Sequence, residues 1–227
     1  MRSGYSTLRF QRMGKIFKSR CWIERERTAC WAVAMAIMLY HLGLSLRRTA
    51  LFLSLHRINV SHVAIWYWIQ KIGKKWAWHK PMPSTLVLDE TCIKLKGRLC
   101  WVFTALDPET WQVVYMEPSY CRNAATVRRF MENMAEVYGK WPNILLSDGG
   151  SWYSSGLRYW KHSSKFAWWV IRGGVRNSIE GFYGEFLKRR VKDFDCYCPS
   201  RKLKSMRRWL WSYCWLHNGI RDGLKFY

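Results

Sequence analysis

The fold is decided by the stretch TLVLDETCIKLKGRLCWVFTALDPETWQVVYME, residues 85–117. Three runs rich in apolar and β-branched residues, 85–95, 99–106 and 111–117, are separated by the short segments KGR and DPET. Glycine, proline and aspartate between such runs are typical of turns. The stretch therefore predicts three consecutive strands joined as an antiparallel meander.

The chain beyond this meander predicts further helices and strands. We expect a helix over 123–138, short strands at 143–147 and 166–171, and another helix at 177–192. The residues expected along the apolar face of the first of these helices are Val127, Phe130, Met131, Met134 and Val137. This element order is that of an RNase H-like fold, an α/β class with a mixed sheet and flanking helices. Such a match predicts a fold, not a function.

The first part of the chain predicts a small all-α domain. An apolar helix is expected over 28–42. Ser45 is placed to cap a helix over 46–53, and Ser61 is placed to cap a third helix over 61–71. Two short helices with a tight link, the second capped by serine, match a helix-turn-helix.

The charge of the chain indicates a polyanionic partner. Lysine and arginine total 38 against 15 acidic residues, a net charge of +23. The segment KKWAWHKPMP at 74–83 predicts a linker between a helix-turn-helix domain, 1–80, and an α/β domain, 81–227. Because basic residues are in excess in both parts, double-stranded DNA is the expected partner, with anionic lipid as the alternative.

In a helix-turn-helix the second helix lies in the major groove, with its N-terminal residues nearest the bases. In this chain those residues are Ser61, His62 and Ile65. The residues suited to phosphate contacts are Lys71, Lys74 and Lys75. An ordinary helical hairpin is the alternative interpretation.

Residues 28–46 are almost uncharged and approach the length of a membrane span. His41, Gly43 and Ser45 weaken that interpretation, so we expect no membrane span. Nothing resembles a secretory cleavage signal, so we expect a cytoplasmic protein, associated with the nucleoid in a prokaryote. Most of the 16 tryptophans are expected in the core, although tryptophans interleaved with basic residues can also stack on bases.

Three acids stand out on this basic chain. Asp89 follows the apolar run TLVL, Asp148 ends the strand NILLS, and Glu180 lies in the first turn of a helix. The predicted fold places these elements side by side, so the carboxylates can converge. Glu185 is the alternative third acid, and strand alternation points Glu90 to the other face from Asp89.

Each acid also has a structural interpretation. Asp89 could pair with Lys94 or Arg98, Asp148 could belong to a simple turn, and Glu180 could be a favourable acid at a helix N-terminus. A carboxylate within an apolar strand is costly unless something neutralises it. Two Mg²⁺ (or Mn²⁺) ions would do so, and such a pair supports in-line displacement at phosphorus. Taken together, the acids favour a catalytic metal site.

The segments LVLDETCIKLKG, ILLSDGGSWY and RNSIEGFYGEFLKRR resemble the three acidic blocks of DDE insertion-sequence transposases, within the retroviral-integrase superfamily. The resemblance covers about residues 40–221, including the helix-turn-helix and WLHNGIR near the end. It implies that Asp89, Asp148 and Glu180 are catalytic metal ligands. Many relatives carry a basic residue seven positions after the glutamate; here that position is Leu187, and Lys188, one further, is the candidate for the DNA-end contact.

The resemblance also implies a reaction. One strand is hydrolysed at each element end, and the freed 3′-hydroxyl then attacks a target phosphodiester. Because two DNA ends must be held together, it implies a homodimer or a higher oligomer on DNA. The alternatives are an RNase H-like nuclease or resolvase that only hydrolyses, and a DNA-binding regulator derived from a transposase.

Overall fold

A computed structural model of the protein describes residues 28–75, 81–95, 97–160, 165–171, 175–184 and 202–223. The strands are β1 (Thr85–Leu95), β2 (Arg98–Leu106), β3 (Val113–Ser119), β4 (Ile144–Ser147) and β5 (Ala167–Val170). The helices are α2 (Cys30–His41), α3 (Leu46–Leu55), α4 (His62–Lys75), α5 (Ala124–Tyr138), α6 (Ser151–Leu157), the 3-10 helix η1 (Arg158–Trp160), α7 (Val175–Phe182) and α9 (Leu203–Gly223).

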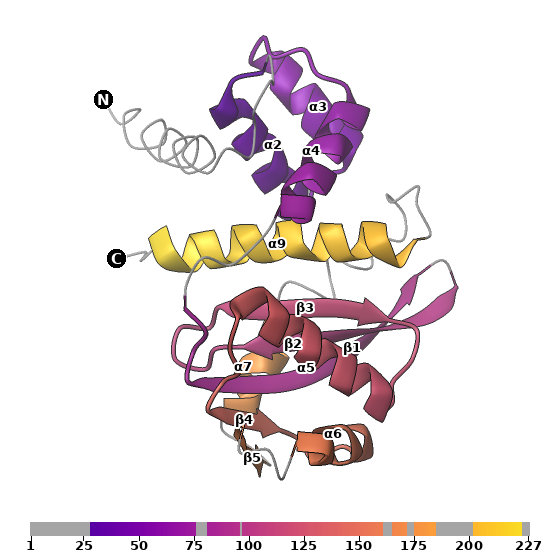
Figure 1. Ribbon diagram of the computed structural model, residues 1–227. Helices are drawn as coiled ribbons and strands as arrows, with labels where there is room; N and C mark the ends of the chain where they lie inside the picture. Colours follow the sequence, from indigo (N-terminus) through magenta and orange to yellow (C-terminus); the bar gives the residue numbers. More distant parts are fainter. Residues whose placement is uncertain are drawn as a thin grey trace.

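The five strands form a mixed sheet in the order β3-β2-β1-β4-β5. The first three make the antiparallel meander expected from the sequence. β4 pairs in parallel with β1, and β5 pairs in parallel with β4. This sheet with helices on both faces confirms the predicted RNase H-like α/β fold, as Figure 1 shows.

The third strand begins two residues later than expected because its turn is wider than the sequence suggested. The Asp107 carboxylate accepts hydrogen bonds from the Glu109 N–H at 2.9 Å and the Thr110 hydroxyl at 2.6 Å. The Asp107 N–H donates to the Gln112 carbonyl at 2.9 Å, and Trp111 has a positive φ of 60°. These contacts keep Trp111 and Gln112 in the loop.

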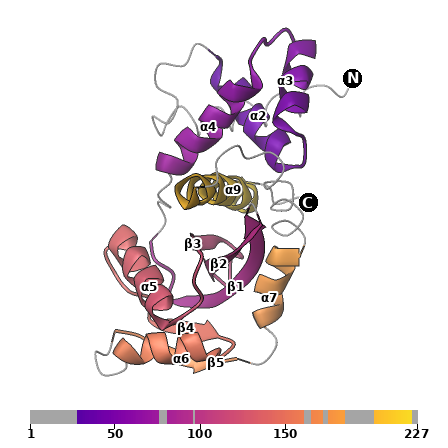
Figure 2. The same ribbon diagram turned by 90° about the vertical axis from the view of Figure 1, so that its right-hand side faces the viewer.

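Helices cover both faces of the sheet, with α5 and α7 on opposite sides in Figure 2. Leu86 and Leu88 of β1 share a core with α5 and α6, whereas Val87 shares one with α7 and α9. Along α5 the expected apolar face is buried as far as Met134, but Val137 is 44% exposed, so that prediction was wrong. The stripe continues instead through Tyr138, one full helical turn after Met134, and its hydroxyl donates to the Val114 carbonyl at 2.9 Å.

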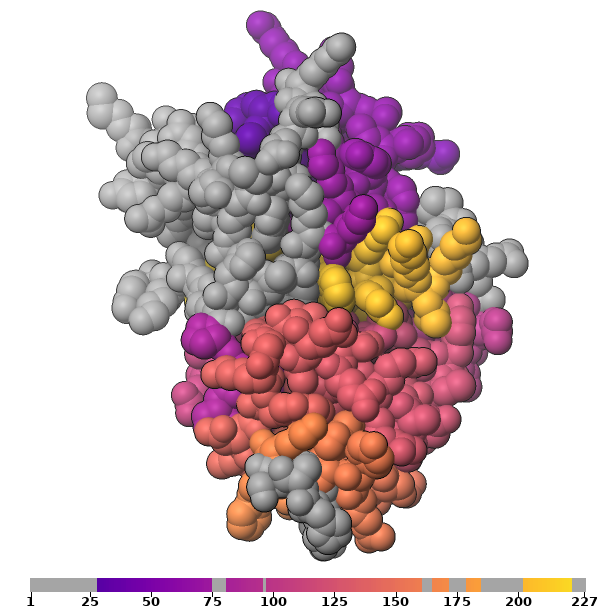
Figure 3. Space-filling model, viewed as in Figure 1, coloured from indigo at the N-terminus to yellow at the C-terminus, as the bar shows by residue number. Residues whose placement is uncertain are grey.

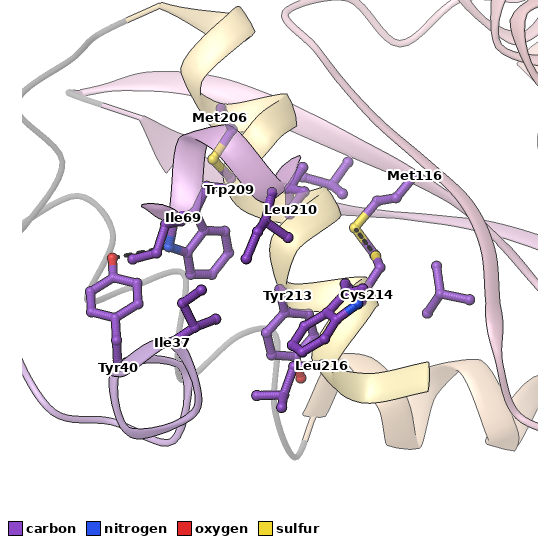
Figure 4. Packing of buried hydrophobic residues seen from close by; sticks show 14 of the residues in the cluster. Ile37, Tyr40, Ile69, Met116, Met206, Trp209, Leu210, Tyr213, Cys214 and Leu216 are labelled. Carbon is purple, nitrogen blue, oxygen red and sulfur yellow. Dashed lines mark hydrogen bonds between the residues drawn. The ribbon is translucent and has the colours of Figure 1, made fainter. Parts of the chain in front are cut away.

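Helix α9 lies between the sheet and the N-terminal helices (Figures 1 and 2). In Figure 3 its yellow atoms are seen at the surface between these two parts, right of centre in the view. Buried side chains of α2, α4, α9 and the sheet form one hydrophobic cluster, which we call the α9 core. Its members labelled in Figure 4 are Ile37, Tyr40, Ile69, Met116, Met206, Trp209, Leu210, Tyr213, Cys214 and Leu216.

The α9 core has contacts on both sides of the helix, as Figure 4 shows. Trp209 is fully buried and its indole N–H donates to the Tyr40 hydroxyl of α2 at 3.0 Å. Toward the sheet, the Cys214 sulfur lies 3.9 Å from that of Met116. The helix therefore joins the N-terminal helices to the sheet through apolar packing.

Helices α4 and α9 approach at their backbones. A Cβ atom at Gly73 would overlap the carbonyl group of Arg208, so only glycine fits there. One turn earlier, the Gln70 amide donates to the Ser205 carbonyl at 3.1 Å. Since α9 belongs by sequence to the second part of the chain and packs on the first, the division near residue 80 stays a prediction.

Helices α3 and α4 begin close to where the sequence predicted, while their assignment as a helix-turn-helix stays a prediction. The Ser45 hydroxyl accepts a hydrogen bond from the Arg48 N–H, and the Ser61 hydroxyl accepts one from the Ala64 N–H, each at 3.1 Å. Both serines are therefore the N-caps that the sequence predicted. Of the helices that the structure describes, none combines the length and the apolar character needed to cross a membrane.

Most of the described tryptophans lie in or against a hydrophobic core, as expected. Within the described ranges, the fully buried ones are Trp68, Trp160, Trp209 and Trp215. The others are half-buried or exposed, and several place the indole against a cationic side chain. An indole has a large apolar face and a polar N–H, which suits it to such boundary positions.

Candidate active site

A pocket of about 530 Å³ opens at the edge of the sheet. Its lining residues are Asp89, Glu90, Thr91, Arg122, Asp148, Trp152, Glu180 and Tyr183, and we call it the acidic pocket. The three acids singled out in the sequence thus come together from β1, from the end of β4 and from α7. Their catalytic and metal-binding roles stay predictions.

The sheet register explains why Asp89 and Asp148 meet. β1 and β4 are parallel, and their last paired residues are Val87 and Leu146. Continuing this register by two residues brings Asp89 level with Asp148. Because neighbouring strands lie about 4.8 Å apart and side chains alternate, both carboxylates then point to the same side of the sheet.

Two glycines after Asp148 allow close packing around that carboxylate. Gly149 has a φ of 78°, and a Cβ there would lie 2.7 Å from Val170 Cγ1 of β5. A Cβ at Gly150 would lie 2.6 Å from the Trp152 ring. The Gly150 N–H donates to the Asp148 carboxylate at 3.0 Å, which holds the side chain in a tight turn.

Glu180 is exposed, but the helix that carries it is anchored by its neighbours. Phe182 and Tyr183 are buried, and the Tyr183 hydroxyl donates to the Asp89 carbonyl at 2.9 Å. The Phe182 ring meets the His217 imidazole of α9 edge-on, with centroids 4.9 Å apart. These contacts fix α7 against both the strand of Asp89 and the α9 core.

His217 itself is held in its neutral form. Its Nε2 donates to the Trp111 carbonyl at 2.9 Å. Burial lowers its pKa from the ordinary 6.5 to about 4, and the positive charge of Arg221 acts in the same direction, although the hydrogen bond to Trp111 opposes them. At neutral pH the packing beneath α7 therefore contains no charged imidazole.

Glu90 lies on the opposite side of β1 from Asp89, toward α6, and yet it also lines the acidic pocket. Its side chain is 4% exposed and accepts hydrogen bonds from the Trp152 indole at 3.3 Å and from Arg122 at 3.5 Å. Burial raises the pKa of Glu90, and the charge of Asp148 adds to that rise; the nearby Tyr153 hydroxyl and the hydrogen bond from Trp152 oppose it. The pocket is therefore open to both faces at this edge of the sheet.

Sequence reasoning missed four residues of this pocket, namely Thr91, Arg122, Trp152 and Tyr183. Trp152 stood inside the block ILLSDGGSWY, but the pattern gave it no role. Arg122 precedes Asn123, the N-cap of α5, and no periodicity marks it because its partners come from distant elements. Only the packing of the loop after β3 against α6 brings it to the acids.

The acids of the pocket suit metal ions held by few protein ligands. In the described part of the chain, no three His, Cys, Asp or Glu side chains are grouped closely enough to hold one ion together. Mg²⁺ keeps several waters and is commonly bound by one or two carboxylates plus substrate phosphates. Asp89 and Asp148, which are hard oxygen donors side by side, fit that mode of binding.

The predicted DNA-contacting residues divide between exposed and buried positions. Ser61, His62 and Lys74 are exposed, and Lys71 lies with its ammonium 5.8 Å from the Tyr67 ring. Ile65 is fully buried, so its prediction as a base contact was wrong. Ile65 is the first residue of the apolar side of α4 that packs in the α9 core.

The exposed side of α4 instead presents side chains that the sequence analysis did not single out. Val63 is 60% exposed and Tyr67 is 58% exposed, and they lie one helical turn apart on the same side of the helix. The side chain of Lys75, and all of Glu185 and Lys188, lie outside the described residues.

Known proteins share this sequence pattern. A protein family described as a DDE domain matches residues 84–218. Uncharacterized protein MJ0017 of Methanocaldococcus jannaschii is 30% identical over 201 residues, which cover 88% of this chain and 91% of that protein. Both matches include the segments that carry Asp89, Asp148 and Glu180.

Two solved structures that resemble the chain come from retroviral proteins. A chain of the simian T-cell lymphotropic virus intasome in complex with PP2A regulatory subunit B56 gamma is 13% identical, with a TM-score of 0.45, covering 77% of this chain and 67% of that one. The HTLV-2 integrase catalytic core domain in complex with magnesium is 14% identical, with a TM-score of 0.42, covering 57% and 82%. The DDE-domain match, residues 84–218, spans more than half of this chain. The chain therefore belongs to the DDE-domain family of transposases.

Proposed function

We propose that the protein is a DNA transposase that cleaves the ends of an insertion sequence and joins the freed 3′-hydroxyl to target DNA. The observation that carries this proposal is the convergence of Asp89, Asp148 and Glu180, from three separate elements, on one pocket of a DDE-domain chain. The net charge of +23 supports a polyanionic substrate around this acidic centre.

The three carboxylates share one part in the proposed reaction, the binding of divalent metal. Asp89 and Asp148 would hold divalent metal together, and Glu180 would complete the set from α7. Two bound Mg²⁺ or Mn²⁺ ions supply activation of the attacking oxygen and stabilisation of the leaving oxygen. The chain's own residues position this centre: the Tyr183 hydroxyl fixes α7 to β1, and the Gly149–Gly150 turn sets the direction of Asp148.

The same proposal assigns the rest of the chain to DNA. Residues 1–80 would read the element ends through α4, with His62 near the bases and Lys71 and Lys74 near phosphates. Residues 81–227 would carry the chemistry. Two ends have to be held at once, so we propose a homodimer or larger assembly on DNA, in the cytoplasm and associated with the nucleoid.

The test uses a duplex that contains the inverted repeats flanking the gene, with Mg²⁺ or Mn²⁺ present. We expect nicking at the repeat ends and strand joining. Asp89→Ala, Asp148→Ala and Glu180→Ala should each lower both rates by about a thousandfold or more, because residues that act as a unit fail together. Binding of the duplex should persist, since the helix-turn-helix is untouched.

The matched control is Glu132→Ala, which removes an exposed acid of α5 outside the pocket and should leave both rates unchanged. Nicking that continues in the triple-alanine protein would refute the assignment of the site. Nicking without any joining would favour a nuclease or resolvase, and binding without nicking by the unaltered protein would favour a regulator.

A further inference from the structure

The loop between β3 and α5 holds a guanidinium group in an unusual setting. The Arg122 guanidinium carbon lies 3.8 Å from the ring centroid of Trp101 in β2 and 3.9 Å from that of Trp152 in α6. At these distances the guanidinium group contacts both rings. Contact with two indoles restricts the orientations open to the planar group and its N–H donors.

The Arg122 side chain reaches the acidic pocket. Arg122 is a lining residue, and its side chain remains 34% exposed. Glu90 contacts one of its five N–H donors at 3.5 Å, a long and weak contact. Glu90 also accepts a hydrogen bond from the Trp152 indole, so the same carboxylate holds the cation and one of the rings that cover it.

The charges around the pocket favour a contact between the Arg122 guanidinium and an anion. Among the lining side chains that the structure describes, four are carboxylates and Arg122 is the single lysine or arginine. A DNA strand that enters brings phosphates, which the carboxylates repel. A fixed, planar fork of donors matches the oxygens of a phosphate, and holding it in advance lowers the entropy lost on binding.

We propose that Arg122, clamped between Trp101 and Trp152, binds a backbone phosphate of the DNA strand that enters the acidic pocket. This inference rests on the proposed function, because it takes DNA as the substrate. Arg122 is then a positioning residue that sets which phosphodiester lies beside Asp89 and Asp148. Glu90 and the two indoles serve to orient the guanidinium.

A scan of uncharged phosphates tests this contact. The probe is the element-end duplex with single phosphates replaced by methylphosphonates along the cleaved strand, bound in Ca²⁺ so that affinity is measured in place of cleavage. In the unaltered protein, one position near the cleavage site should weaken binding by about tenfold, the loss expected for a hydrogen bond to a charged group. In Arg122→Gln the affinity should be lower and that position should lose its effect.

Arg128→Gln is the matched control, because Arg128 also lies over an aromatic ring, that of Tyr159 at 5.4 Å, but does not line the pocket. It should keep the full pattern of methylphosphonate effects. If Arg122→Gln does not fold, Arg122→Lys replaces it, and the proposal requires a smaller effect at the same position because lysine lacks the planar fork.

The proposal is overturned if the variant and the unaltered protein respond equally at every position. A merely structural role for Arg122 would weaken binding without changing which phosphate matters. The proposed function is tested separately, because Asp89→Ala abolishes nicking whether or not Arg122 touches DNA.

Discussion

The acidic pocket and the α9 core lie in one molecule and gather opposite kinds of side chain. The pocket collects four carboxylates and one arginine at an open edge, whereas the α9 core collects apolar side chains that are almost all fully buried. Like charges held close together oppose folding, and buried apolar surface favours it. The difference indicates that the α9 core stabilises the fold, whereas the grouped charges of the acidic pocket destabilise it.

The two regions are also connected. Helix α7 carries Glu180 on its exposed side and Phe182 on its buried side, where Phe182 meets His217 of α9. The α9 core thereby fixes the orientation of Glu180, which lies on a helix and not on a strand of the sheet. Substitutions in the core should change stability first, and substitutions in the pocket should change activity alone.

The largest expected effect on stability is at Gly73. Gly73→Ala forces α4 away from the Arg208 carbonyl, and we expect a loss of about 1–3 kcal/mol in the free energy of unfolding, the usual cost of overpacking. Urea denaturation measures it. Gly219→Ala is the matched control in α9, since its Cβ would meet nothing within 4 Å. It should stabilise the protein by about 0.5–1 kcal/mol through helix propensity.

An unchanged midpoint for Gly73→Ala would mean that α4 and α9 do not approach as described. A loss of stability in both glycine variants would point to a general fragility of α9. Either result would break the contrast between a tight core and an open pocket.

A smaller effect is expected from acid at His217. Its folded pKa of about 4 is below the ordinary 6.5, so the unfolded chain binds the proton more readily. The stability that neutral His217 contributes is therefore complete above pH 6.5 and is lost as the pH falls toward 4. Urea curves at pH 7 and pH 5 should show this loss, and His217→Gln, which cannot titrate, should show less of it. Equal losses in both proteins would exclude His217 as the cause.

The smallest effect on stability is expected inside the pocket. Asp148→Asn keeps an oxygen that can accept from the Gly150 N–H and removes a charge that raises the pKa of Glu90. Without metal, the free energy of unfolding should stay the same or rise by less than about 1 kcal/mol. Thermal and urea unfolding in a chelator measure it. A clear destabilisation would show that Asp148 supports the fold, and the contrast between the two regions would then fail.

The sequence predicted the meander and both serine caps because each depends on neighbours along the chain. The turn segments KGR and DPET and the spacing of Ser45 and Ser61 act locally. Ile65 and Val137 were predicted wrongly because their burial depends on which face of a helix meets another element. Arg122 was missed for the same reason, since its two indoles come from β2 and α6.

By itself, the sequence determined the class of fold, the excess of positive charge and the membership of residues 84–218 in the DDE-domain family. Those features are carried by residue type and short-range order, which a linear pattern preserves. The tertiary structure alone decided that α9 would join the N-terminal helices to the sheet, and that Glu90 and Arg122 would line the same pocket as the acids. Such contacts arise where distant segments exclude water from a shared surface, and a linear pattern does not record which segments meet.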